Sequence, residues 1–290
     1  MSWQRRREQV IEFSIRACGI SSILIVTLIF LFLLREGFAL FRSIPIGDFL
    51  GGHRWYPISE PPRFGILPLI LGSCLVTAGA TILAVPLGIA SALFVSEIAK
   101  GWVREALKTG IELLAAIPSV VLGFIGMAIL SPQIKHAFDL PTGLTALTGS
   151  ITLAFMAMPT IVSITEDALT AVPRGHREAA LALGATKWQM MWRVLLPAAG
   201  SGILAAVMLG IGRVIGETMA VMMVTGNAAV IPRTLLQPVR TLTATIAAEM
   251  GETVRGSDHY FALFAIGIVL FVISFLINMI ADLFLHRERT

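Results

Sequence analysis

The sequence predicts an all-α integral membrane protein with six transmembrane helices. Of the 290 residues, 56% are hydrophobic and only 14% are charged, whereas an average soluble domain is about one quarter charged. Six apolar stretches are each long enough to cross about 30 Å of hydrocarbon as a helix. Helices are the expected spanning form because lipid offers no hydrogen-bond partner to an open backbone. The expected spans lie near residues 14–34, 68–95, 109–130, 143–165, 198–225 and 259–285.

The N-terminal segment predicts a first span that is retained. Its apolar stretch follows a basic start, exceeds the apolar core of a signal peptide, and is not followed by an A-x-A cleavage pattern. We expect residues 1–66 to form a first unit, made of the basic start, this span and an outer loop. Residues 67–290 would hold the other five spans. The outer loop at 41–68 is rich in proline and glycine, which predicts an ordered but irregular segment.

The distribution of Lys and Arg predicts that both termini lie in the cytoplasm. In that orientation thirteen Lys and Arg residues fall in cytoplasmic segments and eight in outer segments, while Arg213 lies inside the fifth span. Cytoplasmic segments of inner-membrane proteins carry such an excess, which also accounts for the net charge of +4. The two chain ends contribute Arg5, Arg6, Arg7, Arg16, Arg287 and Arg289 to the cytoplasmic set.

Prolines and capping residues predict local features of the spans and loops. Pro86, Pro118 and Pro159 fall inside expected spans and should kink them, because proline cannot donate the helical hydrogen bond. In the last outer loop, Thr241 is suited to begin a short helix and Gly251 to end it. That helix is expected to lie across the outer face.

A charged passage between spans four and five predicts two short helices at the cytoplasmic surface. The first helix should end at Gly184, and Thr186 should cap the second, which runs into the fifth span after Pro197. The second helix is expected to carry four large apolar side chains on one side, namely Trp188, Met191, Trp192 and Leu195. A plain amphipathic loop at the membrane interface is the alternative interpretation.

The same passage resembles the EAA loop of the membrane subunits of ABC importers. That loop is patterned as E-A-A, three residues, Gly, nine residues, Ile, one residue and Leu-Pro. Here the pattern is filled by Glu178, Ala179, Ala180, Gly184, Val194, Leu196 and Pro197, and only Val194 departs from it. The resemblance implies a type I ABC importer permease fold, in a bacterial inner membrane, with a coupling helix that docks on a cytoplasmic ATPase. Glu178 is expected near the start of that helix, where the helix dipole favours an acid.

Three further segments resemble the phosphate-importer permeases of the PstC type. They are residues 55–73, 111–127 and 212–227, and the similarity runs from about residue 40 to the C-terminus. The resemblance implies a second homologous permease subunit, two copies of the ATPase and an extracytoplasmic phosphate-binding protein as partners. The chain itself has no G-x-x-x-x-G-K-[ST] motif for ATP, so we expect a non-catalytic subunit. Beyond these proteins we expect contact with membrane lipid and none with nucleic acid.

A charged pair inside the fifth span is the candidate substrate path. Arg213 and Glu217 are four residues apart and would share one face of a helix, where such a costly pair normally faces a bundle interior or an aqueous route. Arginine suits phosphate because its planar fork bonds two oxygens at once. Gly212 and Gly216 have the spacing that permits close approach of another helix. The alternative is an ion pair that only locks two helices together.

Neighbouring polar and apolar residues are assigned less specific roles. Thr218, taken as part of the path, could instead bond a neighbouring helix, and the same two interpretations hold for Thr225 and Asn227. The run of Met219, Met222 and Met223 is interpreted as adaptable packing. At the cytoplasmic end of span four, Glu166 and Asp167 are expected to be solvated.

The sequence shows no constellation typical of catalysis, metal binding or a cofactor. The five histidines form no HxxxH or HExxH pair, and the two cysteines, Cys18 and Cys74, have neither disulfide nor metal spacing. An intramembrane hydrolase would need a nucleophile paired with a base. A proton-coupled carrier, the more distant alternative, would need buried acids in several spans or an internal repeat. Among importers, a permease for another oxyanion is the main alternative.

Overall fold

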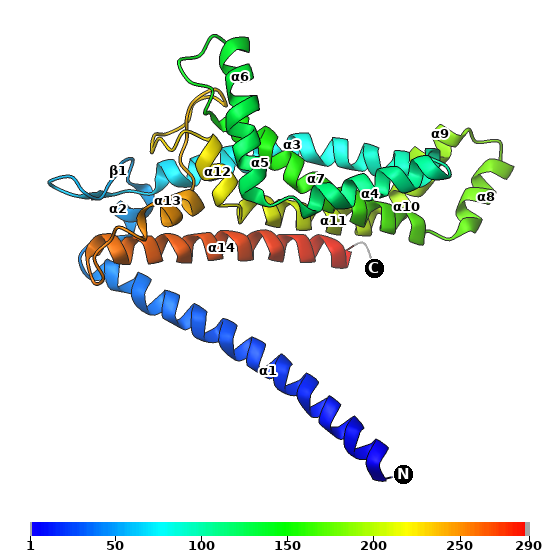
Figure 1. Cartoon of the computed structure of the whole chain (residues 1–290), viewed down its shortest axis with the longest axis horizontal. Coiled ribbons are helices and arrows are strands. Elements are labelled where there is room, and N and C mark those ends of the chain that lie inside the picture. The colour runs from blue at the N-terminus through cyan, green and yellow to red at the C-terminus, as the bar shows by residue number, and fades with distance from the viewer. Residues whose placement is uncertain (1, 288–290) are drawn as a thin grey trace.

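The computed structural model describes residues 2–287, and it describes side chains for residues 11–280 and for Leu283. The long helices are α1 (Ser2–Ala39), α3 (Leu67–Leu93), α7 (Ala146–Ala171), α11 (Gly200–Ile215) and α14 (Asp258–Arg287). Helices α3, α7, α11 and α14 run along the long axis of the molecule, whereas α1 meets α14 at one end and diverges from the bundle at the other (Figure 1). Within the described residues, five helices are long and apolar enough to cross a membrane, or six if one bent pair counts as a span.

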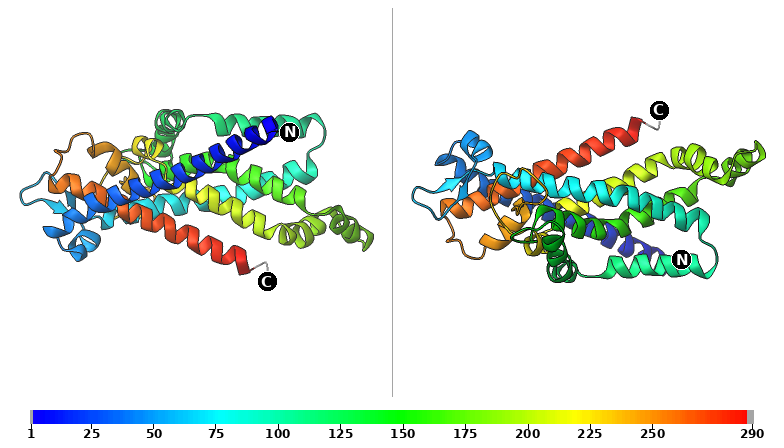
Figure 2. Two further views of the ribbon diagram at one scale, coloured as in Figure 1. Left: turned by 90° about the horizontal axis from the view of Figure 1, so that it is seen from below. Right: turned by 90° about the horizontal axis from the view of Figure 1, so that it is seen from above.

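The two ends of the long axis differ in structure. One end, which we call the hairpin end, holds α2 (Ile46–Gly51), the antiparallel strands β1 (Trp55–Tyr56) and β2 (Arg63–Phe64), and α13 (Leu242–Glu249). The segment 41–68, predicted as the first outer loop, is therefore ordered as predicted, and it contains α2 and the two strands. The opposite end, the α8 end, holds α8 (Arg174–Ala182) and α9 (Lys187–Met190) (Figure 1). The start of α1 and the end of α14 both point toward the α8 end (Figures 1 and 2).

The core lies between α3 and α7, whose small residues let the two backbones approach closely. Ala80 and Ala84 of α3 are buried against Ala157 and Ile161 of α7. A Cβ atom added at Gly88 would lie 2.7 Å from Cγ2 of Ile161, so only glycine fits at this crossing. Small residues at helix contacts are typical of membrane bundles, because close van der Waals packing replaces the hydrophobic effect there. The pair α3 and α7 therefore forms one tightly packed unit.

The third predicted span, 109–130, is wrong in its bounds. An amphipathic helix, α4 (Trp102–Ala116), ends before Pro118, and α5 (Ser119–Ile125), η3 (Gly126–Leu130) and α6 (Ser131–Ala137) follow. Proline pushes the residue before it out of the helical region, and Ile117 is extended at φ −65° and ψ 126°. Pro118 thus separates two helices instead of kinking one, whereas Pro86 and Pro159 lie inside helices as predicted. The continuous apolar segment is 119–137, and α5 and α6 stand across the long axis (Figures 1 and 2).

The fifth predicted span, 198–225, is divided at two points. The segment Lys187–Ala198, made of α9, η4 (Met191–Leu195) and α10 (Leu196–Ala198), meets α11 at an angle of 73°. Helix α11 ends at Ile215, and α12 (Met219–Val224) follows after a break. The short helix predicted in the last outer loop is confirmed as α13, because the Thr241 side chain accepts the backbone N–H of Ala244. Its C-cap is Met250, one residue before the predicted Gly251.

The predicted orientation can be tested by labelling single cysteines. In a chain with Cys18→Ser and Cys74→Ser, we expect His53→Cys to react with an impermeant maleimide in intact cells. Lys187→Cys should react only after permeabilisation, because both positions are exposed and lie at opposite ends of the molecule. Thr245 is unsuitable as an outer reporter because it is fully buried. Labelling of position 187 in intact cells would reverse the orientation. Of the basic residues behind this prediction, Arg289 and the side chains of Arg5, Arg6, Arg7 and Arg287 lie outside the described residues.

Candidate functional site

The passage between α7 and α11 folds as the sequence predicts, into two short helices joined at a glycine. Helix α8 ends at Ala182, and Gly184 follows with φ of +81°, a conformation that disfavours residues with a Cβ. The amide of Ala185 donates to the carbonyl of Ala180, and that of Gly184 donates to the carbonyl of Leu181. These bonds satisfy carbonyls that a helix end leaves free. Gly184 therefore reverses the chain direction after α8.

Thr186 begins the second helix by a reciprocal cap, which confirms that prediction. Its hydroxyl accepts the amide of Gln189 at 3.2 Å, while the Gln189 side chain accepts the amide of Thr186 at 2.9 Å. The four large apolar residues expected on one side divide between two faces. Met191 and Leu195 are buried at 5% and 0% exposure. The side chains of Trp188 and Trp192 are exposed, and their ring centroids lie 5.5 Å apart.

The tip of this passage presents unpartnered side chains at the α8 end of the molecule. Glu178 and Ala179 are exposed, Ala180 is buried, and Leu183 is 89% exposed. Glu178 is the fifth residue of α8, so the expectation that it lies near the helix start is wrong, because the helix begins at Arg174. Its carboxylate therefore points outward from mid-helix and is free to meet another protein.

A buried carboxylate lies behind this tip, where a solvated one was predicted. Glu166 on α7 is 3% exposed, and its oxygens bind Arg104 at 2.6 Å and Lys108 at 2.9 Å. The two cations lie one turn apart on α4, so the amphipathic helix supplies a pair that α7 alone does not reveal. The ion pairs fix α4 to α7. The neighbouring Asp167 is exposed, as expected.

The structure does not bring Arg213 and Glu217 together as an ion pair. Helix α11 ends at Ile215, so the two residues do not share one helical face. A side-chain oxygen of Glu217 instead accepts the amide of Ala220 at 3.2 Å, and its backbone carbonyl accepts the Thr243 hydroxyl at 2.8 Å. The predicted one-turn pair is therefore wrong for this conformation, and Glu217 stabilises the start of α12.

Arg213 is exposed, and its hydrogen bond to the rest of the described chain is long. Its Nη1 lies 3.4 Å from the hydroxyl of Thr160 on α7, and no ion pair to Arg213 occurs within the described residues. The face around it is open, because a Cβ added at Gly212 would meet nothing within 4 Å. Thr218 lies in the break after α11 and donates to the carbonyl of Gly216 at 3.2 Å. Arg213 therefore lies on an exposed face of α11, two residues before the helix ends.

The other residues considered for this region bond their own segment. Thr225 is fully buried, and its hydroxyl donates to the backbone carbonyl of Val221. The side-chain amide of Asn227 donates to the backbone carbonyl of Met222 at 2.7 Å. Both side chains therefore shape the turn after α12. In the described part of the chain, no three His, Cys, Asp or Glu side chains are placed to hold a metal ion.

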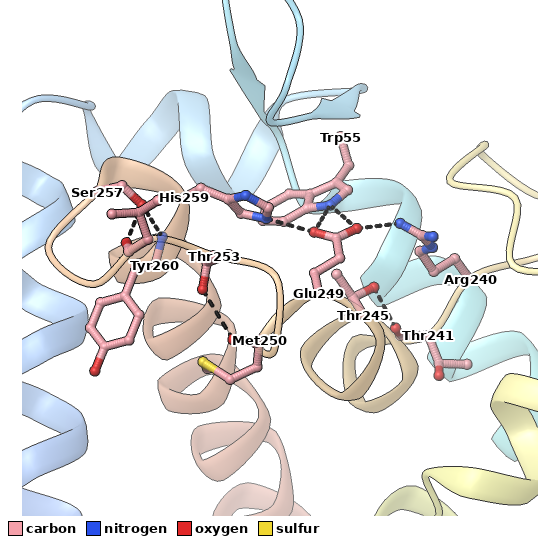
Figure 3. Close-up of polar contacts among 11 residues, drawn as sticks. Trp55, Arg240, Thr241, Thr245, Glu249, Met250, Thr253, Ser257, His259 and Tyr260 are labelled. Carbon is pink, nitrogen blue, oxygen red and sulfur yellow. Dashed lines mark hydrogen bonds and ion pairs between the residues drawn. The ribbon is translucent and has the colours of Figure 1, made fainter.

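A cluster at the hairpin end was not anticipated. Both carboxylate oxygens of Glu249 on α13 accept the Trp55 Nε1–H at 3.1 Å, and one contacts Arg240 at 2.5 Å and the other His259 at 2.8 Å (Figure 3). The cluster joins β1, α13 and α14 at the floor of a cleft of about 800 Å³. No sequence pattern predicts it, because Trp55 is 194 residues from Glu249 and the other members lie on different structural elements.

Comparison with known proteins places the chain among membrane components of transport systems. Residues 84–290 match the family described as "Binding-protein-dependent transport system inner membrane component". The chain is 41% identical over 277 residues to the "Probable ABC transporter permease protein YqgH" of Bacillus subtilis, covering 95% of this chain and 90% of that protein. It is 38% identical over 259 residues to the "Phosphate transport system permease protein PstC" of Mesorhizobium japonicum, covering 83% and 78%.

Solved structures share the fold at lower identity. A chain of the bacterial alginate ABC transporter, in complex with its alginate-bound periplasmic protein, aligns with a TM-score of 0.64 and 16% identity over 94% of this chain and 96% of that chain. A chain of the MetNI methionine ABC transporter in an inward-facing conformation aligns with a TM-score of 0.61 and 20% identity, over 79% and 99%. At these identities the likeness shows the fold alone.

The buried carboxylate generates a stability prediction. Glu166→Gln should lower the free energy of unfolding by about 1–3 kcal/mol, because removing one partner leaves Arg104 and Lys108 uncompensated. We place the loss toward the lower end because both cations are partly exposed. The measurement is the apparent Tm in detergent, with Asp167→Asn as the matched control, since Asp167 is exposed. Equal Tm values for the two variants would contradict a stabilising role for the cluster.

Proposed function

The chain belongs to the family of binding-protein-dependent transport system inner membrane components, and from that premise we propose that it is the permease subunit of an ATP-driven importer of inorganic phosphate. The observation that supports phosphate as the substrate is the 38% identity, over 83% of this chain, to a permease named for phosphate transport. The fold is that of type I ABC importer permeases. As a family member with several apolar helices, the chain is a multi-pass inner-membrane protein.

The proposed subunit does no chemistry of its own. ATP hydrolysis belongs to a cytoplasmic ATPase in two copies, and a second homologous permease completes the path. The open face at Gly212 and Gly216 supports a permease partner, because two small residues one turn apart allow another helix to approach closely. Both termini and α8 would then lie in the cytoplasm, and the hairpin end would face outward.

The ATPase-coupling residues are proposed to be Glu178, Ala179, Ala180 and Gly184. The exposed side chains of Glu178 and Ala179 support this assignment, whereas Ala180 is buried against the protein behind them. Gly184 holds the reversal that lets α8 project and still return the chain to the membrane. A short projecting helix with one small-residue face can enter a groove on the partner, and Glu178 adds a charge that a cationic side chain can recognise.

The substrate-path residues are proposed to be Arg213, Glu217 and Thr218. Arg213 is the fourteenth residue of α11, about 20 Å along that helix, and it is exposed without an ion pair within the described residues. A charge at that depth is too costly to face lipid, so it faces the second permease or an aqueous route. The break at 216–218 supports the second interpretation, because discontinuous membrane helices mark substrate sites in many transporters.

The proposed chemistry uses the two charges separately. The Arg213 guanidinium would bind two phosphate oxygens with charge-assisted hydrogen bonds. Glu217 would accept a hydrogen bond from the proton that phosphate carries at neutral pH, while the same acid would repel sulfate, which has no such proton. A permease for another oxyanion would lack this discrimination. The contact must be weak, because a tight site midway would trap the ion.

The hairpin end is proposed to receive the phosphate-binding protein. Residues 1–66 would supply much of this surface as a first unit, and residues 67–290 would form the permease core. Two clefts support the proposal, one of about 760 Å³ beside Arg54 and Arg63, and one of about 800 Å³ beside Trp55. They share the hairpin between them, and Ile58 near its tip is 87% exposed.

The docking assignment is tested by two substitutions in the assembled complex. Glu178→Lys and Gly184→Val should each reduce phosphate uptake per ATP hydrolysed by about tenfold or more, because the first reverses a recognition charge and the second strains a residue at positive φ. Matched controls are Glu105→Lys, at an exposed cytoplasmic acid, and Gly175→Val, at an open helical glycine of the same α8. Unchanged coupling in both test variants would remove α8 from the ATPase contact.

The path assignment is tested by phosphate uptake in membrane vesicles, normalised to complex abundance. Arg213→Gln should abolish uptake, and Arg213→Lys should retain part of it because the charge stays while the fork is lost. Glu217→Gln should weaken discrimination between phosphate and sulfate, because the amide keeps an acceptor but removes the repulsion. Arg255→Gln, at an exposed arginine of the last outer loop, is the control. Wild-type uptake by Arg213→Gln would exclude Arg213 from the path.

A further inference from the structure

Arg177 precedes Glu178 on α8 but faces the opposite way, into the protein. Its Nε and Nη2 donate to Oε1 of Glu97 at 3.2 and 2.9 Å. Its Nη1 donates to the carbonyl of Val172 and its Nη2 to the carbonyl of Leu169, both at 2.8 Å. The Arg177 and Glu97 side chains are only 20% and 13% exposed. One guanidinium therefore makes four hydrogen bonds in a half-buried position.

These bonds connect three separate elements. Glu97 lies in η2 (Phe94–Ile98), the turn that continues α3. Leu169 belongs to the last turn of α7, and Val172 is its C-cap. A helix end leaves carbonyls without helical partners and carries partial negative charge, so an arginine is a favourable partner there. Arg177 thus fixes α8 to the ends of α3 and α7 together.

Little else attaches α8 to these helices. Ala180 is buried in an apolar cluster with Leu93 and Leu169, whereas the residues of α8 other than Ala180 and Arg177 are exposed. An alanine contact resists sliding weakly, because it is small and non-directional. The four directional bonds of Arg177 fix both the distance and the angle between α8 and the bundle.

From this geometry we infer that Arg177 is a positioning residue that transmits the movement of α8 to α3 and α7. The inference rests on the proposed function, in which α8 docks on the ATPase. Because α3 and α7 are packed tightly at Gly88 and Ile161, a displacement of α8 moves them as one unit. Helix α7 also carries Thr160, which contacts Arg213. A continuous structural route therefore leads from the docking tip to the proposed path.

The test measures coupling in the assembled complex with its ATPase and binding protein. The readouts are complex abundance, basal ATP hydrolysis, its stimulation by the loaded binding protein, and phosphate taken up per ATP hydrolysed. Arg177→Gln should keep basal hydrolysis within about twofold and lose at least about fivefold in stimulation and in uptake per ATP. Arg177→Lys should be intermediate, because a lysine keeps the charge but cannot reach the carboxylate and both carbonyls in one plane.

The matched control is Arg174→Gln, which removes the same charge from the same helix. Arg174 is exposed and makes no hydrogen bond or ion pair in the described part of the chain, so coupling should be unchanged. Glu97→Gln should reproduce part of the defect, and the double variant Glu97→Gln/Arg177→Gln should be no worse than Arg177→Gln alone, since both act on one linkage. If the Arg177→Gln complex does not assemble, the stimulation of ATP hydrolysis and the uptake per ATP are compared between Arg177→Lys and the wild type instead.

Normal coupling in Arg177→Gln, or an equal defect in Arg174→Gln, would overturn the inference. So would additive losses in the double variant, because two independent effects would then be present. A wild-type complex that hydrolyses ATP on stimulation but accumulates no phosphate would instead refute the proposed cargo. The stimulation readout would still decide the role of Arg177, because it depends on the cognate binding protein and not on the identity of its ligand.

Discussion

A protein in lipid must satisfy its own polar groups, since the hydrocarbon provides neither hydrogen bonds nor counter-charges. Most charges in this structure obey that constraint at the ends of the bundle. Glu166 is neutralised by Arg104 and Lys108, and Glu249 is surrounded by donors at the hairpin end. Arg213 lies deep along α11 without such a partner in the described residues. That exception is why we propose Arg213 as a residue of the substrate path.

The helices divide into a compact unit and interrupted segments. Helices α3 and α7 approach closely through glycine and alanine, and neither is broken along its length. The chain is interrupted instead at Pro118, at the bend before Gly200 and at residues 216–218. An unbroken pair can carry a displacement over the length of the bundle, whereas the break at 216–218 ends α11 two residues after Arg213. The architecture therefore combines a continuous, tightly packed helix pair with segments that are interrupted.

Local chemistry was predictable where the responsible residues are neighbours in the chain. Gly184 and Thr186 turn and restart the chain as expected, because a positive φ and a capping hydroxyl depend on a few adjacent residues. Thr241 begins α13 for the same reason. The third span was misplaced because hydropathy does not register how strongly Pro118 disfavours helix at Ile117. The burial of Glu166 was missed because its cations belong to α4, about sixty residues earlier.

The sequence by itself determined the membrane class, four of the six spans in outline, the two-helix passage with its EAA pattern, and the family to which these features point. These properties follow from composition, periodicity and short spacings, which are local in the chain. Only the tertiary structure decided that Arg213 stands apart from Glu217, that Glu249 joins three elements, and that Arg177 binds the ends of two helices. Each depends on where a helix ends or on which distant segments meet, and packing over the whole chain sets both.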